Sequence, residues 1–393
     1  MELTTKQEEG LQIILDLYNN HEKYVVIAGY AGTGKSTLVR FAIEALEVDE
    51  DKVAYATFTG KAAEVLRKKG NKNAMTLHRL LYDSIPKQGG GFFRRPKFKL
   101  EYDIVVIDEV SMVPKSMIDM LLNHRVFCIF LGDPGQLPMI DKEEKHNLLD
   151  HPHVFLDEIM RQAAESEIIQ LTMKIRNGDS IPYMDGKEVK VIPRKDLLTG
   201  HLLWADEIIT ATNAMRHGIN NQMRSLLGYE GLLQEGEKII CKRNYWDDTN
   251  EEGDALVNGT IGKVSNIVYD SNMIIPYWVK CDEHSIPILR ADIEPDAGSS
   301  FEDISLDKTF LTSEAPCLDW KTSYQLGKLK QRIGDIIPKQ ITYGYALTCH
   351  SAQGSEWNNV LVIEEQFPFD KEEHKRWLYT ACTRSSKKLV LIR

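Results

Sequence analysis

The sequence has few cysteines, and they form no motif. The six are scattered over 393 residues, and no two of them make a CxxC pair. This spacing argues against a structural zinc site and against a disulfide framework. A reduced, cytoplasmic protein is therefore expected.

Long apolar runs are also lacking. No stretch approaches eighteen consecutive apolar residues, so a transmembrane helix is not expected. The N-terminus, "MELTTKQEEGLQ", has no basic region followed by an apolar stretch, so it does not read as a secretory signal. The sequence predicts no membrane partner.

Positive charge is in deficit. Lys and Arg number 48 against 58 Asp and Glu, so the formal net charge is −10. This argues against a broad nucleic-acid-binding surface, which needs cations to neutralise phosphates. A narrow basic channel inside an acidic protein remains compatible with it. The length allows two or more domains, and 42% hydrophobic with 27% charged residues is ordinary for a soluble globular protein.

A phosphate-binding loop stands near the N-terminus. The run "KYVVIAG" (23–29) reads as a buried parallel strand, "GYAGTGKS" (29–36) follows, and "KSTLVRFAIEAL" has helical periodicity. Backbone N–H groups of such a loop point at a β-phosphate. Lys35 adds a charge at the β- and γ-phosphates, and the Ser36 hydroxyl is a Mg²⁺ ligand.

Two further strands end in polar residues. "DIVVIDEVSMV" (103–113) places Asp108 to hold Mg²⁺ and Glu109 to deprotonate an attacking water. "VFCIFLGDPGQLP" (126–138) ends near Gln136, whose amide is suited to sense a γ-phosphate. The Asp-Glu pair favours hydrolysis over transfer to a small molecule, so a small-molecule kinase is the weaker alternative.

The three motifs in this order resemble superfamily 1 helicases of the RecD-like and Dda-like branch. The resemblance implies an α/β fold, with two RecA-like parallel-sheet P-loop motor domains, a small hairpin insertion and an SH3-like β-barrel insertion. The implied boundaries are 1–80 and 101–160 for the first motor domain, 81–100 for the hairpin wedge, 161–240 and 340–393 for the second motor domain, and 241–339 for the barrel.

The resemblance also implies roles in nucleotide binding. Gln7 matches an adenine-reading residue, and Arg161 ("DEIMRQ") and Arg384 ("YTACTR") match arginines that meet the γ-phosphate. The implied catalytic residues are Lys35, Glu109, Gln136, Arg161 and Arg384. The implied ATP contacts are Gln7, Gly29, Ala31, Gly32, Thr33, Gly34, Lys35, Ser36, Thr37, Gln136, Gly354 and Glu356, and the implied Mg²⁺ ligands are Ser36 and Asp108.

A DNA track is implied in the same way. In "YATFTGKAAEVL", "AMTLHRLL" and "YGYALTCHSAQGSEW", the residues that match DNA contacts are Phe58, Thr59, Lys61, Thr76, His78, Thr348 and His350. Segment 87–99, "KQGGGFFRRPKFK", has five basic residues, no acidic residue and three phenylalanines, which predicts a basic hairpin. The resemblance makes it a wedge at the duplex fork, with Phe92, Phe93 and Arg94 on DNA; a disordered basic loop is the alternative.

The region from 241 to 339 contains strand-like runs such as "GTIGKVSNIVY", "MIIPYWVKC" and "HSIPILRADI", which predict a small β-barrel.

The protein is expected to be an ATP- and Mg²⁺-dependent helicase that moves 5′ to 3′ on single-stranded DNA as a monomer. No appended domain is expected after the last strand. Its expected partners are single-stranded and forked DNA and single-strand-binding or replication proteins. Two alternatives stay open: a translocase that unwinds poorly, and a nucleotide-gated module that holds a strand without moving. The sequence does not choose among replication, repair and recombination.

Overall fold

The computed structural model describes residues 3–86, 92–138, 148–250, 255–275, 277–279, 281, 284–296, 298–319, 321–323, 326 and 337–393. Within these ranges, no helix is both long and apolar enough to cross a membrane. By their contacts the residues form two compact units. The first unit comprises Met1–Leu81, Lys97–Arg216 and Leu347–Arg393; the second comprises Tyr82–Pro96 and His217–Ala346.

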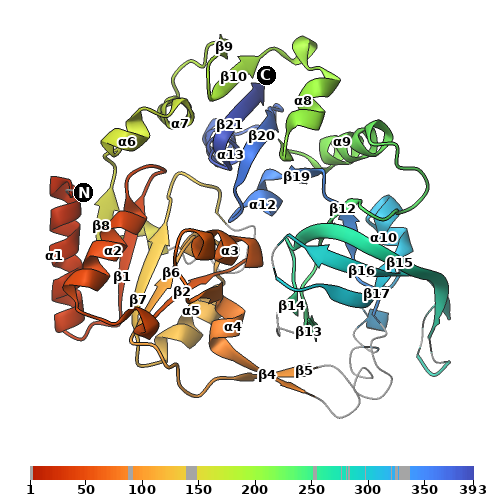
Figure 1. Cartoon of the computed structure of the whole chain (residues 1–393), viewed down its shortest axis with the longest axis horizontal. Helices are drawn as coiled ribbons and strands as arrows, with labels where there is room; N and C mark the ends of the chain where they lie inside the picture. The colour runs from red at the N-terminus through yellow and green to blue at the C-terminus, as the bar shows by residue number, and fades with distance from the viewer. Residues whose placement is uncertain are drawn as a thin grey trace. The chain divides into compact units, whose positions relative to one another are not determined.

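The first unit contains a parallel sheet with strand order β3-β2-β6-β7-β1-β8 (Figure 1). Its strands are β1 Tyr24–Gly29, β2 Val53–Thr57, β3 Ala74–Thr76, β6 Ile104–Ile107, β7 Phe127–Gly132 and β8 Val154–Leu156. The helices among and before them are α1 Thr5–Asn19, α2 Lys35–Ala45, α3 Gly60–Lys68, α4 Leu77–Leu81 and α5 Lys115–Leu122. Short 3-10 turns are η1 Glu50–Lys52, η2 Val110–Met112 and η3 Leu148–Asp150.

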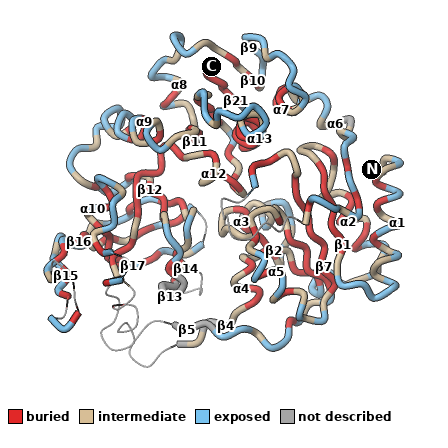
Figure 2. Tube along the Cα trace, turned by 180° about the vertical axis from the view of Figure 1, so that it is seen from behind, coloured by how far each residue is buried: buried red, intermediate tan, exposed pale blue. Residues whose placement is uncertain are grey.

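Continuous apolar runs explain this sheet. Strands β1, β6 and β7 are buried along almost their whole length, as both faces of a parallel sheet require (Figure 2). Ile14 of α1 and Leu38 of α2 pack with the strand residues in one core cluster. Helix α1 begins at a capping box, in which the Thr4 hydroxyl accepts from Gln7 N and the Gln7 side chain accepts from Thr4 N.

The same unit holds a second sheet with order β19-β11-β20-β21-β10-β9. Strands β11, β20, β21 and β10 pair in parallel, and β9 pairs antiparallel with β10. The strands are β9 Met184–Asp185, β10 Val189–Ile192, β11 Glu207–Thr210, β19 Ala346–Thr348, β20 Trp357–Ile363 and β21 Ser385–Ile392. The helices are α6 Arg161–Ala164, α7 Glu167–Asn177, α8 Thr199–Trp204, α12 Cys349–Ala352 and α13 Lys371–Cys382, with the 3-10 turn η4 Arg194–Asp196. Helix α9 Asn213–Leu226 begins in this unit and continues into the second, which starts at His217.

The second unit is built on an antiparallel sheet with order β17-β16-β15-β12-β18. These strands are β12 Lys238–Cys241, β15 Ile261–Ile274, β16 Ser285–Pro295, β17 Phe301–Asp307 and β18 Ile341–Tyr343, with α10 Lys308–Ser313 after β17. Two small ribbons complete it: β13 Tyr245–Thr249 with β14 Ala255–Leu256, and β4 Tyr82–Pro86 with β5 Phe92–Pro96. The expected hairpin is confirmed as the antiparallel pair β4–β5; its glycines at 89–91 lie outside the described residues.

The expected barrel is only partly met. The strand predicted over 273–281 is wrong, because β15 ends at Ile274 and residues 277–279 form a turn. Proline lacks the N–H that a paired strand donates, and the sequence has Pro276 at this point. The segment just before β18 does reach the other edge strand, β17, since Asp307 N donates to Lys339 O (3.0 Å) and Lys339 N donates to Ser305 O (2.7 Å). An SH3-like topology stays a prediction.

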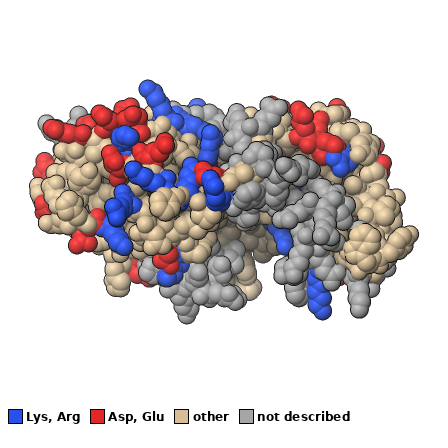
Figure 3. All heavy atoms as spheres, turned by 90° about the horizontal axis from the view of Figure 1, so that it is seen from below, with Lys and Arg blue, Asp and Glu red and all other residues tan. Residues whose placement is uncertain are grey.

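Lys, Arg, Asp and Glu side chains share the face of the molecule that Figure 3 shows. On the face in Figure 3, Lys and Arg side chains lie among Asp and Glu side chains rather than apart from them.

Candidate nucleotide and nucleic-acid site

The phosphate loop joins β1 to α2, as the sequence predicts. Gly32 and Gly34 have φ of 79° and 80°, a region that side chains rarely adopt. A Cβ on Gly34 would also come within 2.4 Å of both Gln7 Nε2 and Met160 Sδ. Helix α2 has no side-chain cap and no acidic residue in its first turn, so its N-terminal N–H groups suit an anion.

Lys35 and Gln7 are held against this loop. The Lys35 ammonium donates to Gly29 O (2.7 Å) and Tyr30 O (3.1 Å). Gln7 is buried, and its amide donates to Thr33 O (3.2 Å) and Gly34 O (3.4 Å). The structure thus places Gln7 on the loop backbone, and its adenine-reading role stays a prediction. Ser36 is exposed at the start of α2.

The two predicted carboxylates follow β6. Asp108 Oδ1 accepts from Glu109 N (2.9 Å), and Glu109 has a φ of 53°. Burial raises the pKa of Asp108; the negative charge of Glu109 raises it further, and the positive charge of Lys35 opposes both effects. A hydroxyl and a carboxylate are the hard oxygen ligands that Mg²⁺ prefers, so Ser36 and Asp108 fit the predicted ion in kind.

This pKa predicts how stability depends on pH. The folded protein holds the Asp108 proton more tightly than the unfolded chain, whose carboxyl has a pKa near 3.8. This contribution to stability is therefore complete below pH 3.8 and is lost as pH rises through the higher pKa of the folded state. We expect Asp108→Asn to raise Tm by about 2–4 °C at neutral pH without nucleotide, and the gain to vanish toward pH 4. Thermal melts across pH measure this. The exposed Asp103→Asn is the control, and a lower Tm for Asp108→Asn at pH 7 would contradict the assignment.

Gln136 and Arg384 converge on Glu109. The Gln136 amide donates to Glu109 Oε1 (3.3 Å), and Arg384 Nη2 lies 3.8 Å from the same oxygen. Arg384 is only 5% exposed. Its guanidinium donates to Thr380 O (3.1 Å) and Ser355 O (3.3 Å), which fix its direction. Three of the predicted catalytic residues are therefore brought together although they come from distant parts of the sequence.

A second link, between Tyr379 and Asp133, was not predicted as part of the site. The Tyr379 hydroxyl donates to Asp133 Oδ2 (2.7 Å) and accepts from Ala31 N of the phosphate loop (2.9 Å). Burial raises the pKa of Asp133, and hydrogen bonds from Tyr379 and Gly135 N act against it. The only sequence signals were an Asp directly after a buried strand and a tyrosine beside the arginine motif.

Removal of this hydroxyl should be costly. Tyr379 is 2% exposed, so little water reaches its hydroxyl. Tyr379→Phe therefore leaves Ala31 N and Asp133 Oδ2 without this hydrogen-bond partner. We expect the free energy of unfolding to fall by about 1–3 kcal/mol, measured by urea titration without nucleotide. Tyr24→Phe is the control, because the Tyr24 hydroxyl has no hydrogen bond to another described residue and should change stability by less than about 0.5 kcal/mol. Equal stability of the two variants would count against the bridge.

Other bonds join the same segments. Leu137 N donates to the Thr380 hydroxyl (2.9 Å), and the Gln353 amide donates to Leu137 O (2.6 Å). Glu356 pairs with Lys69 (3.4 Å). Gly354, with φ of 70°, faces the Thr59 hydroxyl, which lies 3.3 Å from the position of a Cβ. The predicted nucleotide contacts Gly354 and Glu356 thus lie beside α3.

Among the predicted DNA contacts, Phe58 and His78 lie together, with ring centroids 5.8 Å apart. Lys61 lies over the Trp357 ring at 4.4 Å. The hydroxyls of Thr59 and Thr76 accept from backbone N–H groups of Ala62 and Arg79, so both have a local structural role.

The remaining predicted contacts have less structural context. The Thr348 and Ser351 hydroxyls are 3.0 Å apart, and burial lowers the pKa of His350. The side chains of Phe92, Phe93, Arg94 and Arg161 lie outside what the structure describes, although their backbones belong to β5 and α6. No group of three or more His, Cys, Asp and Glu side chains that could hold a metal occurs among the described residues.

Comparison with known proteins is consistent with this geometry. Residues 2–197 match the family model "AAA domain", and residues 343–392 match "UvrD-like helicase C-terminal domain". The RecBCD enzyme subunit RecD of Buchnera aphidicola subsp. Schizaphis graminum is 32% identical over 98% of this chain and 73% of its own length. The ATP-dependent RecD2 DNA helicase of Deinococcus radiodurans is 26% identical over 95% of this chain.

The lengths differ: the chain spans about half of RecD2, 47% of that protein. The crystal structure of the Bacteroides Pif1 helicase in complex with ADP-AlF3 and ssDNA covers 100% of this chain and 92% of its own, at 18% identity and a TM-score of 0.48.

Proposed function

Because the chain belongs to the RecD, Pif1 and Dda branch of the superfamily 1 helicases, we propose that it hydrolyses ATP to move along single-stranded DNA and unwind duplexes. The observation that carries the proposal is the convergence of Gln136 and Arg384 on Glu109, in the compact unit that contains the phosphate loop. Such a set serves attack by water on a terminal phosphate.

Each residue has a defined task in this proposal. The N–H groups of the loop and the Lys35 ammonium bind the phosphates of the substrate. Ser36 and Asp108 would hold Mg²⁺, which would neutralise charge on the phosphate oxygens. Glu109 takes the proton of the attacking water. Gln136 orients that water, and Arg384 stabilises the charge that develops on the γ-phosphate.

The hydrogen bonds between the two sheets support a mechanical output. Loop residues Asp133 and Leu137 are bonded to Tyr379 and Thr380 of α13 and to Gln353 after α12, so a change at the γ-phosphate would reach the segments that flank the strands of the second sheet. Cyclic gain and loss of the Arg384 attraction would alternate the grip of the two sheets on a strand. We infer movement from 5′ to 3′, as the resemblance implies, and contact of the β4–β5 hairpin with the fork.

The test is ATP hydrolysis with and without single-stranded DNA, followed by unwinding of forks that carry a 5′ or a 3′ tail. We expect DNA to stimulate hydrolysis at least about tenfold, and unwinding from the 5′ tail only. Unwinding from the 3′ tail would keep the motor and overturn the direction. Stimulation without unwinding would favour a translocase, and hydrolysis indifferent to DNA would overturn the DNA track.

A further inference from the structure

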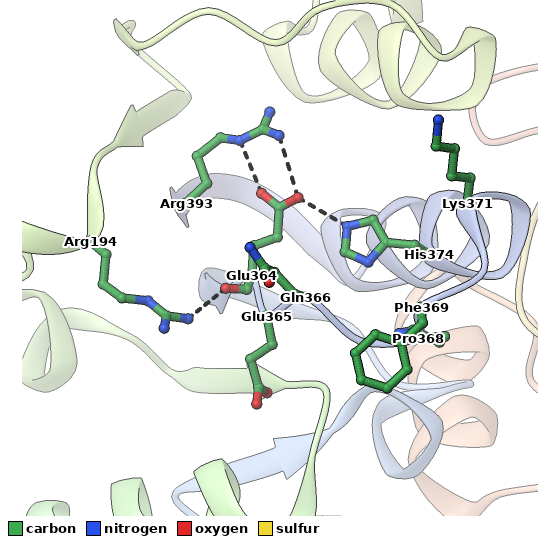
Figure 4. Close-up of a pocket in the computed structure, with 9 residues that line it drawn as sticks. All are labelled: Arg194, Glu364, Glu365, Gln366, Pro368, Phe369, Lys371, His374 and Arg393. Carbon is green, nitrogen blue, oxygen red and sulfur yellow. Dashed lines mark hydrogen bonds and ion pairs between the residues drawn. The ribbon is translucent and has the colours of Figure 1, made fainter.

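A cavity of about 650 Å³ opens at one edge of the second sheet (Figure 4). Arg194 follows β10, Glu364 follows β20 and Arg393 follows β21, and these strands run in parallel. The cavity therefore lies at the carboxyl ends of parallel strands, the edge where open α/β sheets bind ligands. Its volume is in the range of ligand sites in proteins.

The cavity is distinct from the nucleotide site. Arg384 immediately precedes β21, whereas Arg393 immediately follows it. Eight residues of strand at about 3.3 Å each place about 25 Å between the two ends. A ligand of the cavity is thus a separate ligand, or a separate part of a long one.

The two carboxylates that line the cavity are already compensated. Glu364 pairs with Arg393 (3.0 Å) and His374 (3.0 Å), as the dashed lines in Figure 4 mark. Glu365 accepts from Ala211 N (2.7 Å), Thr212 N (3.0 Å) and the Thr212 hydroxyl (2.7 Å). The Arg393 charge offsets that of Glu364, and three hydrogen bonds satisfy Glu365, so both carboxylates already have partners outside the cavity's ligand.

The cations of the wall have capacity left. Arg194 uses one nitrogen to donate to Glu364 O (2.7 Å), and its side chain is exposed. The Lys371 ammonium has no ion pair or hydrogen bond with another described residue. Three acidic residues lie beside it in the sequence. Asp370 caps the helix and accepts from Glu372 N (2.9 Å) and Glu373 N (3.0 Å), Glu372 pairs with Lys375 (2.6 Å), and Glu373 is exposed. The wall therefore suits a ligand with one or two negative charges.

An aromatic platform lies beside these cations. Phe369 is 86% exposed, and its ring meets Phe367 edge to face at 5.6 Å. Cations next to an open aromatic face are the pairing by which proteins hold single-stranded nucleic acids, phosphates on the cations and bases on the rings. A nucleotide unit fits both parts of this wall.

Hydrogen bonds link the wall to the strands beside Thr348, a predicted DNA contact. Glu365 fixes the backbone at Ala211 and Thr212, directly after β11. Strand β11 neighbours β19, which ends at Thr348, and the Thr210 hydroxyl is 3.4 Å from Leu347 O. Thr348 is a predicted DNA contact. Single-stranded DNA bound at Thr348 would therefore contact the same β-sheet whose strand ends form the cavity.

We propose that this cavity binds one nucleotide unit of the single strand outside the segment held by the motor, with a base on Phe369 and phosphates at Lys371 and Arg194. The proposal rests on the proposed function, because it extends that DNA path. It gives the protein a longer footprint on the strand than Phe58, His78 and Thr348 alone provide.

The experiment compares oligothymidines of two lengths, about 8 and about 16 nucleotides, by fluorescence anisotropy with the full chain. We expect Phe369→Ala to weaken the longer one about tenfold and leave the shorter one unchanged. Lys371→Ala should lower the slope of log affinity against log salt by about 0.7 for the longer one only, which is one lost phosphate contact. Tyr183→Ala, which removes a 63% exposed aromatic outside the cavity, is the matched control and should change neither.

Each outcome decides one question. If Phe369→Ala loses affinity equally for both oligothymidines, or for neither, the inference is overturned. The proposed function stands in that case as long as the wild-type protein binds them. No wild-type binding to either oligothymidine overturns the proposed function. A parallel titration with thymidine 5′-monophosphate distinguishes single-stranded DNA from a free nucleotide as the ligand. If Phe369→Ala loses affinity for the monophosphate but not for the longer oligothymidine, single-stranded DNA is not the ligand of the cavity.

Discussion

Arg384→Ala is expected to lower the rate of ATP hydrolysis at least about 1,000-fold, the range found for arginines that stabilise charge on a transferring phosphoryl group. Arg384 is the buried cation whose Nη2 lies 3.8 Å from Glu109, and its guanidinium is held by two carbonyl oxygens. Steady-state hydrolysis with saturating single-stranded DNA measures the loss. Affinity for a non-hydrolysable ATP analogue should change by less than about threefold, because the phosphate loop binds the substrate.

Two companions separate charge from packing. Arg384→Lys keeps the charge but lacks the planar fork that spans Thr380 O and Ser355 O, so we expect it to stay at least about 100-fold impaired. Arg40→Ala removes an exposed arginine of α2 and should retain wild-type turnover. Near-normal hydrolysis by Arg384→Ala would show that the arginine is a structural link only.

Glu109→Gln should lower hydrolysis by about 100- to 10,000-fold, the usual contribution of a general base. The change preserves size, and the backbone N–H of residue 109 keeps its bond to Asp108 Oδ1. Binding of ATP and of single-stranded DNA should therefore persist, and the variant should hold both without turnover. Single-turnover hydrolysis and filter binding measure the two properties.

The matched control is Glu44→Gln, which changes an exposed glutamate of α2 in the same way and should leave the rate unchanged. Hydrolysis by Glu109→Gln within about threefold of wild type would remove Glu109 from the role of base. The water would then need another acceptor, and Asp133, buried nearby behind Tyr379, is the next residue to test.

The sequence predicted what depends on local pattern. The strand expected over 23–29 is observed as β1 Tyr24–Gly29, because a β-branched apolar run before a glycine loop has few alternatives. The carboxylates and Gln136 follow buried strands, and the carboxyl ends of parallel strands share one edge of a sheet. Their proximity could therefore be expected before any coordinates.

Long-range pairing could not be predicted in this way. The bond between Tyr379 and Asp133 joins residues 246 positions apart, and nothing in either local sequence specifies the partner. The positive φ of Glu109 could not be predicted either, because a sequence pattern leads one to expect this conformation at glycine and not at glutamate. The strand expected over 273–281 was a wrong prediction, because the prediction gave more weight to the apolar content of this run than to the proline within it.

The order of the second sheet has a consequence for biosynthesis. Strand β21 lies between β20 and β10, so the sheet has no continuous hydrogen-bond ladder until Ser385–Ile392 has left the ribosome. Strand β10 ends at Ile192, and at about 5–20 residues per second its partner follows about 10–40 s later. During that interval one edge of β10 has unpaired backbone groups, which makes it a template for wrong pairing. Arg384 immediately precedes β21, so the arginine proposed to act in ATP hydrolysis is made in the same step in which that edge is covered.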